Sequence, residues 1–122
     1  MSYRDLSGPQ QAFFTFRDLV QQYPNSQYAA DARQRMVYLR NMFAKHEINI
    51  ANYYYQRGAY VAAANRATYV IQTYQHSPQV AEALVILVKA NRALHLQQAA
   101  DDALRTLQAN YPNSPELRYL AN

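Results

Sequence analysis

Histidines and carboxylates are the side chains of this sequence best suited to acid–base chemistry or to binding a metal ion. His46, His76 and His95 are widely separated and form no HExxH or HxxxH pair, the spacings that place two imidazoles on one face of a helix. Asp101 and Asp102 are adjacent, so on a helix they project about 100° apart and cannot act as a pair. We therefore expect surface imidazoles at His76 and His95 and solvated carboxylates at both aspartates.

Serine, cysteine and glycine supply no catalytic motif either. Ser7, Ser26, Ser77 and Ser114 all precede predicted helices, so we interpret them as caps whose hydroxyl accepts a backbone N–H bond. The chain has no cysteine, which excludes disulfides, thiolate metal sites and cysteine nucleophiles, and its two glycines cannot build a phosphate-binding loop. We expect no catalytic residue, no metal ion and no cofactor.

The composition is typical of a helical protein about one domain long. Half of the 122 residues are apolar, Ala and Tyr are frequent, and Gly is rare. These features favour helix over sheet. No stretch approaches the roughly 20 apolar residues that a membrane-spanning helix needs, so we expect this chain not to insert into a membrane.

The basic residues do not form the dense stripe that is usual in nucleic-acid-binding domains, although the formal net charge is +4. Arg33, Arg35, Arg40 and Lys45 form a candidate patch, but their helical positions point in several directions. Asp31 stands one turn before Arg35, and we expect these two side chains to pair. We interpret the patch as a solvated face, with a binding surface as the alternative.

A tyrosine-and-serine pattern occurs three times, at residues 23–26 (YPNS), 74–78 (YQHSP) and 111–115 (YPNSP). Each copy follows one amphipathic segment and precedes another, which is typical of a helical repeat array. The tyrosines of the second and third copies are 37 residues apart, close to the roughly 34 residues of a tetratricopeptide helix pair. Such arrays bind proteins more often than they catalyse reactions.

These signals predict an all-α, tetratricopeptide-like array of about five helices, one of them unusually long, in a single domain covering residues 1–122. The long helix is predicted because residues 27–57 contain neither Gly nor Pro and keep one apolar stripe, which Gly58 ends as a C′ glycine. The other predicted helices begin at Pro9, at Tyr60, at Ser77-Pro78 and after a break near His95, and Pro115 starts at most a single turn.

The predicted apolar faces place the core between neighbouring helices. Leu84 and Leu87 lie on one face of the fourth helix and Leu104 on one face of the fifth, so we expect all three to be buried between these helices. The alanines at positions 62–64 and 67 allow a neighbouring helix to pack closely against the third.

A candidate partner-binding surface lies at the end of the long helix. Tyr53, Tyr54 and Tyr55 are consecutive and spread over about 200°, so they cannot all enter one core face. Tyr53 shares a row with His46, Asn49 and Arg57, and exposed Tyr beside Arg is typical of interface hot spots. The alternative is that these tyrosines pack inward and only their hydroxyls reach water.

Arg66 borders the buried face of the third helix and is the residue we expect at the centre of docking. The positions one turn away are Ala62, Ala63, Tyr69 and Val70, so its own helix offers no carboxylate. A carboxylate from a partner could accept its bidentate fork. The alternative is a solvated arginine, or one bonded to a carbonyl of the long helix.

Several segments resemble the BamD family, the tetratricopeptide lipoproteins of the bacterial outer-membrane β-barrel assembly machinery. The resemblance covers nearly the whole chain. Its segments are Phe16–Leu19, Tyr23–Tyr28, Ala30–Arg35 and Tyr53–Arg66, followed by Tyr74. The part from Arg57 to Arg66 is the most specific, because generic repeat proteins share the Tyr-Pro-x-Ser turns but not this ending of the long helix.

The resemblance implies the C-terminal, scaffolding half of such a protein, with the family's lipid anchor expected in a part that this sequence lacks. It implies a location at the periplasmic face of the outer membrane. It also implies docking of a periplasmic POTRA domain of the barrel subunit BamA through Asn65 and Arg66, and contacts with smaller assembly lipoproteins. The predicted partner-binding residues are His46, Tyr53, Arg57, Asn65 and Arg66.

Two other functions stay open at this point. One is a tetratricopeptide module that captures extended peptides in its concave groove. The other is a basic helical protein that binds nucleic acid, whose affinity would fall steeply with salt.

Overall fold

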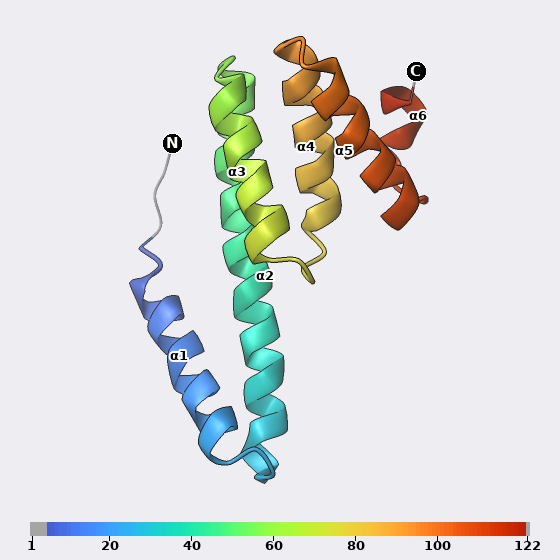
Figure 1. Cartoon of the computed structure of the whole chain (residues 1–122). Coiled ribbons are helices and arrows are strands. Elements are labelled where there is room, and N and C mark those ends of the chain that lie inside the picture. Colours follow the sequence, from blue (N-terminus) through green and yellow to red (C-terminus); the bar gives the residue numbers. More distant parts are fainter. Residues whose placement is uncertain (1–4, 122) are drawn as a thin grey trace. The chain divides into compact units, whose positions relative to one another are not determined.

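The computed structural model describes residues 5–121, and in that range it contains six α-helices and no strand (Figure 1). The predicted all-α, tetratricopeptide-like array is therefore confirmed, including the single turn at its end. The helices are α1 (Ser7–Gln22), α2 (Gln27–Gln56), α3 (Tyr60–Thr73), α4 (Val80–Ala93), α5 (Gln97–Asn110) and α6 (Leu117–Leu120).

The prediction of one long helix is confirmed, since α2 is continuous from Gln27 to Gln56. It ends in a Schellman motif. The Gly58 N–H donates to the Tyr55 carbonyl at 3.0 Å, and the Ala59 N–H donates to the Tyr54 carbonyl at 2.9 Å. Gly58 has a φ of 78°, the left-handed conformation that glycine adopts without a steric penalty.

The break after α4 has the same hydrogen-bond pattern without a glycine. His95 has a φ of 61°, its N–H donates to the Arg92 carbonyl, and the Leu96 N–H donates to the Asn91 carbonyl. His95 thus occupies the C′ position of α4, and its side chain is exposed, as expected for a surface imidazole.

Two predicted helix starts are wrong by about two residues. α1 begins at Ser7 rather than Pro9, because the Asp5 carboxylate accepts the Ser7 N–H at 2.9 Å and supports an earlier first turn. α4 begins at Val80, since Ser77, Pro78 and Gln79 form a turn ahead of it.

The predicted capping by serine hydroxyls is also wrong. The buried hydroxyls of Ser26 and Ser77 make no hydrogen bond within the described chain. A capping hydroxyl would accept a hydrogen bond from the N–H group three residues later. Here that N–H group donates instead to the backbone carbonyl of the serine. Ser114 uses its hydroxyl to donate to the Glu116 carboxylate at 2.7 Å.

The chain divides into two compact units, an N-terminal unit up to Phe43 and a C-terminal unit from Ala44 onward. The boundary falls inside α2, so this helix contributes to both. In the N-terminal unit Phe13 meets Phe43 edge to face at 6.3 Å, while no residue of α1 is fully buried. That residues 1–122 act as one domain stays a prediction.

The C-terminal unit has two hydrophobic clusters, and α4 contributes to both. The first joins α2, α3 and α4 and consists mostly of alanines, with Ile48 and Val70 as fully buried larger residues that the sequence analysis did not select. The second joins α4, α5 and α6 around Leu84, Val88 and Leu107. α4 is therefore buried on opposite sides, which explains why eight of its residues are buried.

The expectation of three buried leucines between α4 and α5 is confirmed only for Leu84. Leu87 is partly buried and packs against both clusters, and Leu104 is partly buried at the edge of the second. The fully buried leucine of α5 is Leu107, one turn after Ala103 and Leu104.

Leu107→Ala should lower the free energy of unfolding by about 2–5 kcal/mol, because it removes buried contacts and leaves a cavity. Leu96→Ala is the matched control, since Leu96 is 51% exposed and its truncation should change stability by less than about 0.5 kcal/mol. Urea denaturation followed by circular dichroism would measure both. Equal midpoints for the two variants would contradict the assigned core.

Gly58→Ala should destabilise the chain by about 1–2 kcal/mol, because an L residue is strained at positive φ. Nothing lies within 4 Å of a Cβ atom added there, so backbone strain rather than a clash would cause the loss. Gly8→Ala is the control. Its Cβ also meets nothing within 4 Å, and inside α1 alanine should be neutral or stabilising by up to about 1 kcal/mol. Thermal melts should show a lower melting temperature for Gly58→Ala and an unchanged or higher one for Gly8→Ala.

Candidate functional site

The C-terminal end of α2 presents a tyrosine on which an arginine is stacked, and this arginine directly follows the last residue of the helix. The Arg57 guanidinium carbon lies 4.5 Å from the centre of the Tyr53 ring, one helical turn away. Tyr53 in turn meets Tyr54 edge to face at 5.9 Å. Arg57 is exposed and Tyr53 is half-buried, so this cation–π pair is held in a defined position at the surface.

The neighbouring tyrosines belong mainly to the core. Tyr54, Tyr55 and Tyr60 pack against the cluster of α2, α3 and α4. The Tyr55 ring lies 5.3 Å from that of Tyr60, and the Lys89 ammonium sits 4.7 Å from the Tyr55 ring centre. The inward packing that the sequence analysis kept as an alternative therefore describes Tyr54 and Tyr55, and Tyr53 lies at the edge.

Arg66 pairs with a carboxylate of its own chain. Its Nη1 donates to Oε2 of Glu47 at 2.7 Å, across 19 residues of sequence. The side chain of Glu47 is 16% exposed and that of Arg66 is 43% exposed. The sequence did not reveal this contact, because the carboxylate comes from α2 and not from the helix of Arg66.

A pair of tyrosines lies close to this ion pair. Tyr69 and Tyr74 meet edge to face with ring centres 6.0 Å apart. Burial raises the pKa of Tyr74 to about 12, and the neighbouring Tyr69, its hydrogen bond and the negative charge of Glu47 add to the rise. Glu47 is thus close enough for its charge to act on Tyr74.

The outer face of α3 carries exposed apolar side chains on either side of Asn65. Val61 is 60% exposed and Tyr69 is 45% exposed, and Asn65 between them is exposed as well. Residues four apart lie on one ridge of a helix, so these three form one row beside Arg66. Sequence analysis missed Val61 and Tyr69. The sequence feature that could have identified them is an apolar residue that lies outside the predicted buried face of the helix.

The structure joins only part of the predicted binding set directly. Tyr53 and Arg57 touch, whereas Arg66 is held by Glu47, which was not in the set. His46 is half-buried on α2, next to Glu47, and Asn65 is exposed on α3. We call the exposed row together with Arg66 and Glu47 the α3 surface. Two of its members, Arg66 and Tyr69, are of residue types that are enriched at interface hot spots.

The candidate basic patch does not act as one group. Arg33 donates to the Pro24 carbonyl at 3.1 Å, and Arg35 pairs with Asp31 at 2.9 Å as predicted. Lys45, in the C-terminal unit, pairs with Glu82 at 3.3 Å. These three cations thus each have a local partner, whereas Arg40 is half-buried and its Nε makes no hydrogen bond within the described chain.

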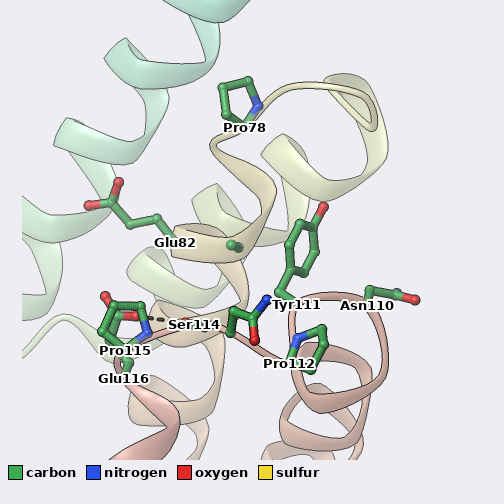
Figure 2. A pocket seen from close by; sticks show the side chains of 10 residues that line it. Pro78, Glu82, Asn110, Tyr111, Pro112, Ser114, Pro115 and Glu116 are labelled. Carbon is green, nitrogen blue, oxygen red and sulfur yellow. Dashed lines mark hydrogen bonds between the residues drawn. The ribbon is translucent and has the colours of Figure 1, made fainter.

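An open groove of about 640 Å³ lies between the start of α4 and the turn after α5 (Figure 2). Pro78, Tyr111, Pro112 and Pro115 line it with two carboxylates. Both carboxylates already have partners. Glu116 accepts the Ser114 hydroxyl, which lowers the Glu116 pKa. Glu82 points away from Tyr111 toward α2, where Lys45 meets it. Both carboxylates of the groove are thus already engaged within the chain.

The remaining candidates for chemistry are surface groups. Asp101 accepts a hydrogen bond from Gln97, and Asp102 pairs with Arg105, both within α5. His76 is exposed. Within residues 5–121 no three His, Cys, Asp or Glu side chains gather as metal ligands would. Among the described helices, none combines the length and apolar character needed to cross a membrane.

The family model and the curated relatives that match this chain all belong to one group of outer membrane proteins. The model of the YfiO family, described as outer membrane lipoproteins, matches residues 1–107. The chain is 46% identical to the outer membrane protein assembly factor BamD of Xylella fastidiosa, over 97% of this chain and 40% of that protein. The BamD proteins of Neisseria gonorrhoeae and Vibrio cholerae are 46% and 36% identical, over 97% and 88% of this chain and 44% of each relative. The chain thus spans less than half the length of the curated relatives it matches.

The raised pKa of Tyr74 should make stability fall as the pH rises from about 10 to 12. An unfolded tyrosine loses its proton near pH 10, whereas folded Tyr74 keeps its proton to about 12. The stabilisation is therefore complete below pH 10 and is lost through the folded pKa. Tyr74→Phe should lose less stability than the parent between about pH 10 and 12 in urea titrations. Tyr119→Phe, at a 59% exposed residue, should lose as much as the parent.

Proposed function

Because the chain belongs to the YfiO family of outer membrane lipoproteins, we propose that it is a non-catalytic scaffold of the machinery that assembles outer-membrane β-barrel proteins. The observation that carries this proposal is its identity of 46% to BamD assembly factors over nearly its whole length. An all-helical repeat array with exposed side chains on one helix suits a protein that holds other proteins together. The proposal places the chain at the periplasmic face of the outer membrane.

We further propose that the α3 surface docks a periplasmic POTRA domain of the barrel subunit BamA. Arg66 is partly exposed and is flanked by Val61, Asn65 and Tyr69, so it can offer charged, polar and apolar contacts together. Arginine and tyrosine dominate the energetics of many interfaces, and apolar neighbours exclude water from such contacts. The proposed surface continues along α2 to its end, with His46 beside Glu47 and then Tyr53 and Arg57. Smaller lipoproteins of the assembly are further proposed partners.

A catalytic role has little support from the described side chains. The histidines are dispersed and the aspartates of α5 pair with residues of their own helix. Specificity of a scaffold instead depends on placing a few side chains rigidly at its surface. The stacked Arg57 and the paired Arg66 are placed in this way.

Arg66→Ala should weaken binding of the isolated BamA POTRA region from the same organism. Removing one side of a desolvated charge contact costs about 2–5 kcal/mol of binding free energy, so we expect a loss of at least about 30-fold in affinity. Isothermal titration calorimetry would measure the affinity, and a thermal melt would show that the variant is folded.

Arg105→Ala provides the control for this measurement. Arg105 is an exposed arginine of α5 that pairs with Asp102 three residues away, so its removal changes the net charge equally but spares the α3 surface. Its affinity should match that of the parent. A folded Arg66→Ala variant with parental affinity would refute the docking role of Arg66.

A further inference from the structure

We infer that Glu47 is a positioning residue that holds Arg66 ready for docking, an inference that rests on the proposed function. The contact runs between two helices, from α3 to α2, and its 2.7 Å distance is that of a charge-assisted hydrogen bond. Arg66 has no carboxylate within one turn on its own helix. Glu47 therefore supplies from α2 an anchor that the helix of the arginine lacks.

The burial of the two side chains differs in the way that a positioning role requires. Glu47 is largely shielded, whereas Arg66 keeps 43% of its side-chain surface exposed. A shielded acceptor 2.7 Å from the guanidinium can thus orient an arginine that still reaches the molecular surface.

A comparison with a second ion pair between helices of the C-terminal unit supports this distinction. Lys45 and Glu82 are 3.3 Å apart and their side chains are 50% and 39% exposed. An exposed ion pair of this kind contributes little. The Arg66–Glu47 pair is shorter, and its acidic member is less than half as exposed.

Contact with Glu47 orders the Arg66 side chain before the partner binds. Docking then has to restrict less side-chain motion, which should strengthen binding. A long side chain that becomes fixed on binding costs about 0.5–1.5 kcal/mol, which corresponds to about 2- to 12-fold in affinity.

The test compares the affinity of the isolated POTRA region for Glu47→Ala, Arg66→Ala and the double variant of the 122-residue chain. Glu47→Ala should weaken binding by about 2- to 12-fold. In the Arg66→Ala background the same change should have no further effect, because there is no arginine left to position. A merely structural role of Glu47 would weaken binding in both backgrounds.

Two further variants make the outcome decisive. Glu47→Gln keeps the size of the side chain and should also weaken binding. It takes the place of Glu47→Ala in the test when the alanine variant does not fold. Glu82→Ala removes the glutamate of the more exposed pair with Lys45 and should bind like the parent. Parental or tighter binding by folded Glu47→Ala or Glu47→Gln, with Arg66→Ala weakened, would overturn the positioning role alone. Parental binding by Arg66→Ala would overturn the docking proposal as well.

Discussion

Close packing of small side chains among α2, α3 and α4 is the contact on which the C-terminal unit depends. Six alanines and three larger aliphatic residues form this cluster. Alanine lets helix backbones approach closely. A closely packed interior tolerates little displacement of its side chains. The approach of α3 to α2 brings Arg66 within 2.7 Å of Glu47, and that of α4 places Lys89 over Tyr55. The surface contacts therefore follow from the packing beneath them.

The central position of α4 explains how a short array maintains a core. Its residues serve the alanine-rich cluster on one side and the cluster around Leu107 on the other. α5 and α6 complete the second cluster, and Arg92 of α4 donates to the carbonyl of Leu120 and so holds the last turn. Because buried side chains are concentrated in the middle of the unit, the outer face of α3 can carry exposed residues.

Electrostatics contributes to the proposed function through single contacts rather than through total charge. The net charge of +4 is spread over the chain, and Arg33, Arg35 and Lys45 have local partners. Exposed ion pairs of this kind contribute little to stability and are screened by salt. The contact between Arg66 and shielded Glu47 differs because water is largely excluded from its acidic side. A partner would therefore recognise an oriented guanidinium more than a diffuse positive field.

The sequence by itself determined the helical class, the length of α2, the stop at Gly58 and the family, because helix periodicity, glycine conformation and motif order are local properties. It also indicated that Tyr53 and Arg57 share one row, because they are four residues apart at the end of α2. Only the tertiary structure decided that Glu47 of α2 meets Arg66 of α3, that Val61 and Tyr69 stay exposed, and that α4 is buried on both sides. It also decided that the serine carbonyls, not their hydroxyls, accept the first N–H groups of the next helix. These outcomes depend on which helices pack together and how closely, and that information is spread over residues far apart in the chain.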